Sequence, residues 1–259
     1  MARLPRIVLA ILVIPFGAPT AARADQNSDL RTATIESVAR NRKEWGVDLE
    51  VGTSLQRGNV DKSLGKFTTS LFKANDPYSV YLDGVYAFGA VGVKRFENRA
   101  TGTLRLDYRM SPFWKIFVFT THGFNEFQKL AYRGSMGAGP WVDFEVGGTK
   151  HGVSAAVSHE FEQFYGFAAE RTARGSLRYL FFVPISENAG AGFDFFYCPS
   201  LGDFADHHLY WAPFLEAKVI DQWMTMKLSV SIERDSRPKP GVFANDTQTM
   251  VSIGFHGGK

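Results

Sequence analysis

One short stretch of the sequence holds the residue types of a serine hydrolase. VSHEFEQF contains Ser158, His159 and Glu160 in a row, and such an enzyme needs a nucleophile, a histidine base and an orienting acid within hydrogen-bond reach. Adjacent side chains on a strand point to opposite faces, so Ser158 cannot partner His159. Loop midpoints give a register that sets His159 opposite Met136 and Leu177, and neither is a nucleophile. We therefore predict no catalytic residue, and a lipid-modifying hydrolase stays an alternative.

Two other groups suggest a ligand by composition alone. His207 and His208 follow Asp203 and Asp206, which are metal-ligand types, but a solvated loop explains them better. GSMGAG at 134–139 has the glycine content of a phosphate-binding loop, yet it falls inside a predicted strand. The CxxC, HExxH, GxSxG and Walker patterns do not occur in the sequence. The sequence therefore predicts no metal and no cofactor.

The elements that carry these residues alternate with a period of two. In TGTLRLDYRM, Leu104, Leu106 and Tyr108 share one parity, and Arg105 and Asp107 share the other. This alternation is typical of a half-buried strand, and 23 Phe and 9 Tyr residues also favour a β-rich chain. The sequence predicts about twelve strands, at 45–56, 63–74, 78–88, 99–110, 113–124, 132–145, 150–162, 174–183, 189–198, 207–220, 223–234 and 247–255.

The links between these strands alternate in length. Short links such as NDP, SP and VGGT alternate with longer ones such as GAVGVKRFEN and DSRPKPGVFAND. Outer-membrane barrels have short periplasmic turns and longer extracellular loops. We therefore predict a closed antiparallel up-and-down transmembrane β-barrel whose apolar face meets lipid and whose charged face meets the lumen. A soluble periplasmic lipocalin-like binding barrel, with the apolar parity inside, is the alternative fold.

The parity also predicts which side chains line the lumen. Their mixed signs favour a salt-bridge ladder that fills or narrows the barrel, and they leave open a structural role or a small-solute pore. Gly137 and Gly139 would make room for a large side chain opposite them. The lumen-lining candidates are Asp48, Glu50, Arg105, Asp107, Arg109, Arg133, Asp143, Arg178, Lys227 and Glu233, with Asp194, Glu216 and Lys218 on the same parity.

Aromatic residues near the strand ends predict two interfacial belts. Tyr and Trp are enriched where a membrane meets water, and we expect His159 to lie there as well, near the lipid headgroups. The aromatic candidates are Trp45, Tyr78, Tyr81, Tyr108, Phe113, Trp114, Phe144, Tyr210, Trp211 and Trp223.

The first residues have the features of a secretory signal peptide. A basic start, an apolar run and an Ala-Arg-Ala site predict cleavage after Ala24. Residues 25–44 would form a periplasmic leader with a possible short helix, and residues 45–259 the barrel. Cleavage would remove three of the 29 Lys and Arg residues. The number that remains would equal the 26 Asp and Glu residues. The mature chain is then near neutral, and we expect no nucleic-acid partner.

The order of several motifs resembles a known family, the salt-induced outer-membrane proteins catalogued as domain of unknown function 481. The motifs are Trp45-Gly46, Gly52 leading to RGNVD with Gly58-Asn59 and Asp61, RLDYRMS, YRGSMGAGPWV starting at Tyr132-Arg133, and NDTQTMVSIGF with Asp246-Thr247. The resemblance covers residues 45–255. It implies an outer-membrane barrel of the cell envelope, stress- or salt-induced, with no established chemistry and no catalytic residues to transfer.

The last strand carries the candidates for an assembly signal. Val251, Ile253 and Phe255 share one parity, and HGGK follows the terminal aromatic residue. A barrel of this type is expected to contact outer-membrane lipid, lipopolysaccharide and the barrel assembly machinery.

Overall fold

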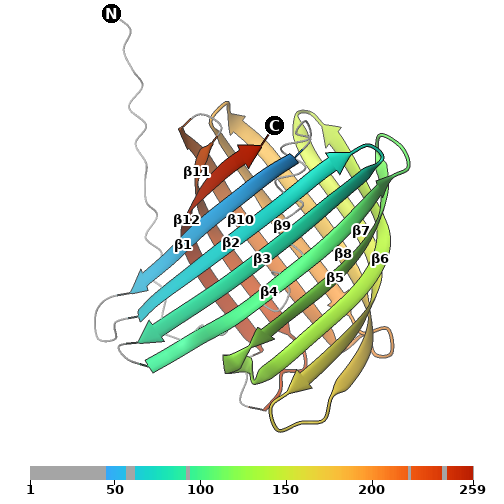
Figure 1. Ribbon diagram of the computed structural model, residues 1–259, viewed down its shortest axis with the longest axis vertical. Helices are drawn as coiled ribbons and strands as arrows, with labels where there is room; N and C mark the ends of the chain where they lie inside the picture. The colour runs from blue at the N-terminus through green and yellow to red at the C-terminus, as the bar shows by residue number, and fades with distance from the viewer. Residues whose placement is uncertain (1–44, 57–61, 92–93, 221–222, 241–243, 259) are drawn as a thin grey trace, which may run out of the picture.

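The computed structural model describes residues 45–56, 62–91, 94–220, 223–240 and 244–258, which form one closed barrel (Figure 1). Twelve antiparallel strands pair with their neighbours in chain order, and β1 pairs with β12 to close the ring. The strands are β1 (Trp45–Gln56), β2 (Lys62–Asn75), β3 (Tyr78–Val91), β4 (Lys94–Arg109), β5 (Trp114–Asn125), β6 (Leu130–Val146), β7 (Thr149–Phe164), β8 (Glu170–Ser186), β9 (Ala189–Pro199), β10 (His207–Ile220), β11 (Met224–Asp235) and β12 (Asn245–Gly258), with a 3-10 turn, η2 (Glu126–Gln128), before β6.

The predicted fold class is confirmed, and β4 and β8 begin several residues earlier than predicted. β4 begins at Lys94 and β8 at Glu170, whereas the sequence patterns start at 99 and 174. The long link predicted at 89–98 is wrong, because the ladder between β3 and β4 continues through Ala90 and Arg95. Backbone pairing extends there past the point where the side chains cease to alternate clearly. The predicted signal peptide and leader lie outside the described residues.

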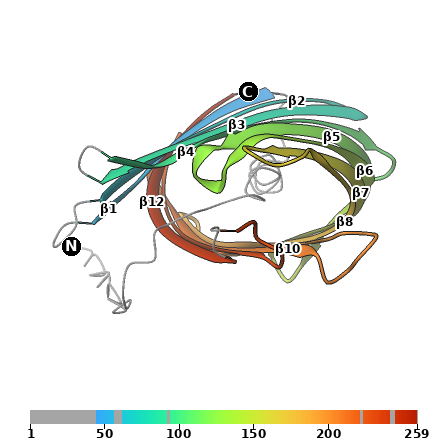
Figure 2. The same cartoon turned by 90° about the horizontal axis from the view of Figure 1, so that it is seen from below.

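The ends of the barrel differ in their connections. The end where β1 begins and β12 ends has tight turns, such as the one between β6 and β7 at Gly147 and Gly148. Their φ angles of 58° and 79° lie in the left-handed region, which a two-residue hairpin turn requires and glycine adopts without strain. The longer loops lie at the opposite end, including 165–169, 200–206 and 236–244. Seen along the barrel, the cross-section is flattened (Figure 2).

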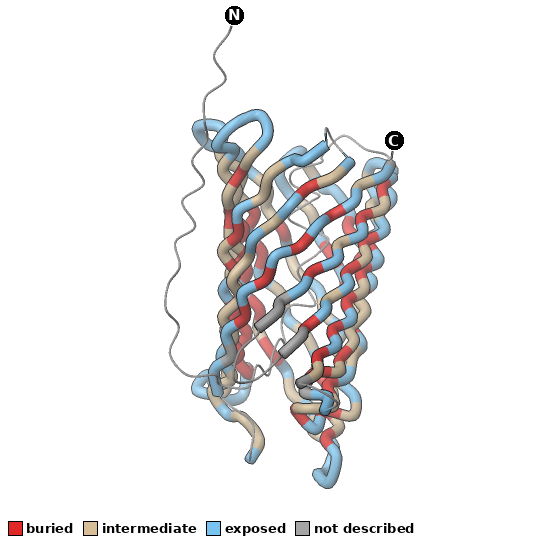
Figure 3. Tube along the Cα trace, turned by 90° about the vertical axis from the view of Figure 1, so that its left-hand side faces the viewer, coloured by how far each residue is buried: buried red, intermediate tan, exposed pale blue. Residues whose placement is uncertain are grey.

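The two faces of the sheet have opposite polarity. Along β4, Leu104 and Leu106 are 40% and 45% exposed, whereas Arg105 and Asp107 are 7% and 4% exposed. Buried and exposed residues alternate in this way along the strands (Figure 3). The apolar parity therefore faces outward, which is the reverse of a lipocalin-like soluble barrel. In the described part of the chain, no helix has the length and apolar character needed to cross a membrane.

Most of the predicted belt aromatics lie on the outside of the barrel. Tyr78 contacts Tyr108 with ring centroids 5.3 Å apart, and Trp223 contacts Phe255 at 6.2 Å, both at the tight-turn end. Tyr81 and Tyr210 are buried, so their predicted place in a belt is wrong. Both share the inward parity of their strands, and Tyr210 packs on Phe196 inside the barrel.

Candidate functional site

The middle of the lumen contains two buried arginine and aspartate pairs. Arg178 on β8 donates from Nε and Nη2 to the two carboxylate oxygens of Asp194 on β9, at 3.0 and 2.7 Å. Arg105 on β4 bonds in the same forked way to Asp107, at 2.6 and 3.0 Å. All four residues are buried. Each guanidinium therefore has a carboxylate partner that compensates in part for its loss of water.

Aromatic rings lie against the same two guanidinium groups. The Cζ atom of Arg105 is 4.2 Å from the ring centre of Phe117 and 5.1 Å from that of Trp141. The Cζ atom of Arg178 is 5.9 Å from Trp141 and 4.4 Å from Phe196. A cation over an aromatic face is attracted to it, and more strongly where water is excluded. We call these five residues, Arg105, Phe117, Trp141, Arg178 and Phe196, the central layer.

Glycines on β6 and β7 make room for the central layer. Phe119 and Phe117 pair across the sheet with Gly137 and Gly139, which confirms that these glycines face large side chains. The Trp141 indole lies where a Cβ on Gly152 would stand. Beside the layer, a cavity of about 20 Å³ remains, which is room for about one water molecule. The central layer therefore narrows the lumen on the side of β4 to β9.

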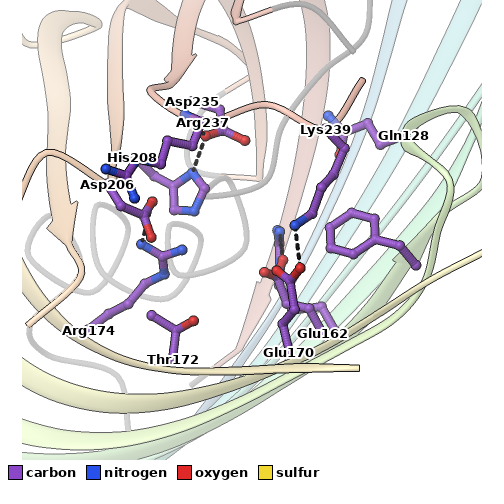
Figure 4. A pocket seen from close by; sticks show the side chains of 12 residues that line it. Gln128, Glu162, Glu170, Thr172, Arg174, Asp206, His208, Asp235, Arg237 and Lys239 are labelled. Carbon is purple, nitrogen blue, oxygen red and sulfur yellow. Dashed lines mark hydrogen bonds and ion pairs between the residues drawn. The ribbon is translucent and has the colours of Figure 1, made fainter. Parts of the chain in front are cut away.

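A larger polar pocket lies at the long-loop end of the lumen (Figure 4). We call it the mouth pocket. It has a volume of about 240 Å³ and is lined by the ends of β6 to β8, β10 and β11 and by the adjoining loops. Ion pairs form its wall: Arg174 with Glu160 at 2.6 Å and with Asp206 at 3.4 Å, Lys239 with Glu170 at 2.5 Å, and Arg133 with Glu162.

His208 is the buried imidazole of this pocket. Its Nδ1 atom is 3.8 Å from a carboxylate oxygen of Asp235, too far for a hydrogen bond. Its Nε2 atom is buried and has no hydrogen-bond partner in the described structure.

The opposite wall of the lumen is also hydrogen-bonded. Lys227 lies 3.5 Å from Glu50, which accepts a hydrogen bond from Ser252 at 2.7 Å. Nearer the tight turns, His256 contacts Asp48 through Nδ1 and Thr225 through Nε2, both at 2.9 Å. These contacts join β11, β12 and β1 across the closing ladder.

The predicted lumen residues fall into three groups by exposure. Arg109 is exposed at the rim of the barrel, 3.5 Å from Asp76. The half-buried members include Asp143, whose carboxylate accepts a 2.5 Å hydrogen bond from Lys115. The buried members are Asp48, Arg105, Asp107 and Arg178, and the half-buried ones are Glu50, Arg133, Asp143, Lys227 and Glu233.

The assembly-signal candidates lie on the outer face. Val251, Ile253 and Phe255 are exposed and pair with Thr53, Val51 and Leu49 of β1. β12 continues to Gly258, so the residues after Phe255 extend the strand.

The predicted alternatives for catalysis and metal binding gain no support from the geometry. Ser158 shares the inward parity, whereas His159 is exposed on the opposite face of β7. His159 pairs with Met136, as predicted, and with Ala173 rather than Leu177. The second pairing was wrong because β8 starts earlier than its side-chain pattern suggests. No group of three metal-ligating side chains occurs among the residues that the structure describes.

Sequence reasoning missed most of the mouth pocket. Arg174 has the same parity as Arg178, four residues away, but the segment before it was read as a loop. Glu160 and His208 were considered only as parts of a hydrolase and a metal cluster. Glu162 and Arg174 lie at the ends of the predicted strands 150–162 and 174–183, on the inward parity, but neither was named as a lumen residue.

Comparisons with known proteins agree with the barrel. The NanC porin aligns with a TM-score of 0.52 and 10% identity, over 82% of this chain and 99% of that chain. The translocator domain of the autotransporter NalP from Neisseria meningitidis aligns with a TM-score of 0.45 and 11% identity, over 86% and 92% of the two chains. The likeness to NanC concerns the fold alone.

At the level of sequence, the model of one family matches residues 49–256, and its description is "Protein of unknown function, DUF481". No curated protein matches the chain.

Proposed function

The chain belongs to the DUF481 family, and from this premise we propose that it is an integral outer-membrane β-barrel of a Gram-negative cell envelope that acts as a narrow passive pore. The observation that carries the proposal is the polarity of the wall, apolar outside and charged inside. Outward Leu and aromatic side chains suit lipid, and a polar lumen suits water and small solutes. The predicted salt-induced role and cleavage after Ala24 are parts of the same proposal.

The central layer supports a narrow pore rather than a wide one. Trp141 is 1% exposed and lies between two guanidinium groups. Passage is then restricted to the wall formed by β1, β11 and β12, where Glu50 and Lys227 are half-buried. A pore of this kind passes ions and small polar solutes and excludes larger ones.

The proposal is of a pore and not of a lipid-modifying hydrolase. Ser158 and His159 lie on opposite faces of one strand, so the hydrolase would lack its nucleophile and base pair.

The test combines gel migration with single-channel recording. Detergent-folded protein should migrate differently with and without boiling, and should give small conductance steps in a planar bilayer. Trp141→Ala should enlarge the steps, whereas Trp211→Ala, which changes an outward ring, should not. If neither the folded wild type nor the folded Trp141→Ala variant conducts, the proposed pore is contradicted. A chain that shows no heat-modifiable migration contradicts the barrel.

The remaining parts of the proposal have separate tests. The mature protein should be found in the outer-membrane fraction, and its N-terminal sequence should begin at Asp25. Its level should rise in high salt more than in sucrose of equal osmolarity. Lipid and lipopolysaccharide would contact the outer apolar face, and the assembly machinery would bind β12. Phe255→Ala should then lower the yield of folded barrel in cells, and normal yield would argue against that signal.

A further inference from the structure

The mouth pocket holds a buried polar atom that lacks a partner. His208 is 6% exposed, and its Nε2 atom has no hydrogen-bond partner in the described structure. In Figure 4 this side of the ring faces into the pocket, away from Asp235. A buried polar atom without a hydrogen bond costs free energy. The pocket therefore favours an occupant that bonds to this atom.

The chemistry of that bond follows from the ring's other nitrogen. Nδ1 is the nitrogen nearest to Asp235, at 3.8 Å, so the carboxylate favours the tautomer with its proton on Nδ1. Nε2 then presents a lone pair and accepts a hydrogen bond. The occupant must bring an N–H or O–H donor to this point.

Arg174 lies on the neighbouring side of the pocket, below His208 and Asp206 in Figure 4. Its guanidinium is buried and carries five N–H donors. Nε bonds to Glu160 and Nη1 to Asp206. The Nη2 donors have no partner in the described structure and suit a carboxylate, which arginine binds in a planar fork.

The charges that line the pocket balance. Four cationic side chains and four carboxylates face it: Arg133, Arg174, Arg237 and Lys239 against Glu162, Glu170, Asp206 and Asp235. A ligand with a net charge would disturb this balance, whereas a ligand with one charge of each sign would keep it. The volume of about 240 Å³ exceeds that of a small amino acid and excludes a long oligomer.

We propose that the mouth pocket binds a small α-amino acid as its zwitterion. The carboxylate accepts hydrogen bonds from Arg174, and the ammonium group donates to Nε2 of His208. This inference deepens the proposed function, and rests on it, by naming a class of solute that the lumen takes.

Three probes separate the two halves of the ligand. L-Alanine has both groups, trimethylglycine has both charges but no N–H donor, and propionate has only the carboxylate. Isothermal titration calorimetry of the refolded full chain should detect binding of L-alanine. The other two should bind about tenfold more weakly or not at all, because one hydrogen bond or one charge contact is missing.

Variants of His208 test the contact itself. His208→Leu removes the acceptor and should weaken alanine binding about tenfold. His208→Gln keeps a side-chain oxygen and should restore much of it. His207→Leu is the matched control, because His207 is the next residue on β10 and does not line the pocket. Heat-modifiable migration checks that each variant is folded.

Several results would overturn the inference. Equal affinity for L-alanine and propionate would make the pocket an anion site. Absence of alanine binding to the folded wild type would end the proposal, and so would unchanged affinity in His208→Leu. If the barrel conducts but binds no alanine, this inference is wrong and the proposed pore still stands. If the barrel binds alanine but shows no conductance, the proposed pore is wrong and the binding site still stands.

Discussion

At the scale of single residues, the lumen depends on how its buried charges are paired. Parity predicted that Arg105 and Arg178 face inward, but it could not predict their partners. Arg105 bonds to Asp107 on its own strand, whereas Arg178 bonds to Asp194 on the next. The difference depends on side-chain conformation and on the aromatic rings that pack beside each guanidinium. The alternation of side chains along a strand predicts neither of these.

Arg178→Met should destabilise the barrel strongly. The variant leaves Asp194, which is 1% exposed, as an unpaired buried carboxylate, a loss of about 3–5 kcal/mol in the free energy of unfolding. Adding Asp194→Leu should recover most of that loss, because no charge is then left buried. Arg109→Met, in an exposed pair with Asp76, should cost at most about 1 kcal/mol. Urea unfolding in detergent measures all three, and similar losses for Arg178→Met and Arg109→Met would refute the argument.

Asp203 gives the loop end a contact that depends on pH. Its carboxylate accepts hydrogen bonds from the Ala205 backbone N–H at 3.0 Å and from Arg237 at 2.6 Å. The hydrogen bond from Ala205 does most to lower the pKa of Asp203 from its usual 3.8, and the hydrogen bond from Arg237 lowers it further. Because the folded pKa is depressed, the contact is complete above about pH 4 and is lost as the pH falls through the lowered pKa.

Carboxyl-carbon NMR can follow this titration. The midpoint of Asp203 should lie below 3.8 and should rise in Arg237→Gln. Arg109→Gln should leave it unchanged, since Arg109 lies at the other end of the barrel. A midpoint above 3.8 in the wild type would contradict the loop contact.

At the scale of strands, the alternation of side chains predicted most of the fold. β1 and β10 have the predicted bounds. In β1 the apolar and polar residues alternate almost to the last position. The starts of β4 and β8 were missed, since their first residues are mainly charged or small. There, hydrogen bonding to a neighbouring strand extends the element, and the partner strand is not visible in a local pattern.

Gly152→Leu should prevent β6 and β7 from packing correctly. A side chain at this position would overlap the Trp141 indole, whose neighbours in the central layer leave it little room to move. We expect a lower yield of heat-modifiable barrel and a loss of about 1–3 kcal/mol in the barrel that does fold. Gly65→Leu is the control, because Gly65 is exposed and its nearest neighbouring atom is 4.0 Å away. Equal folding of both variants would show that the contact at Gly152 is dispensable.

At the scale of the whole molecule, the barrel reverses the polarity of a soluble protein. Its outer wall exposes many large apolar side chains, and its interior buries aspartate, glutamate and arginine. The sequence predicted this reversal from link lengths and from charges on one parity. It could not predict that aromatic rings fill part of the lumen, because inward Phe117 and Trp141 look the same in sequence as outward aromatic residues.

Tryptophan fluorescence should report this reversal. Trp114 is 51% exposed on the outer wall, whereas Trp141 is 1% exposed inside. In vesicles of brominated phospholipid, a variant that retains only Trp114 should be strongly quenched. A variant that retains only Trp141 should keep its emission, because the barrel wall separates the indole from lipid. Equal quenching of the two would place both rings against lipid and contradict the inward orientation of Trp141.

The alternation of side chains also bears on how the protein reaches its proposed membrane. A chain destined for the outer membrane must first pass through the translocation channel of the inner one. That channel releases long apolar segments sideways into the bilayer, and such a segment needs about 20 residues. Here the longest strands have 17 residues, and polar or charged residues interrupt the apolar ones along each strand. The continuous apolar surface therefore exists only after folding. The same pattern that lets the folded barrel face lipid therefore lets the unfolded chain cross the inner membrane without being inserted into it.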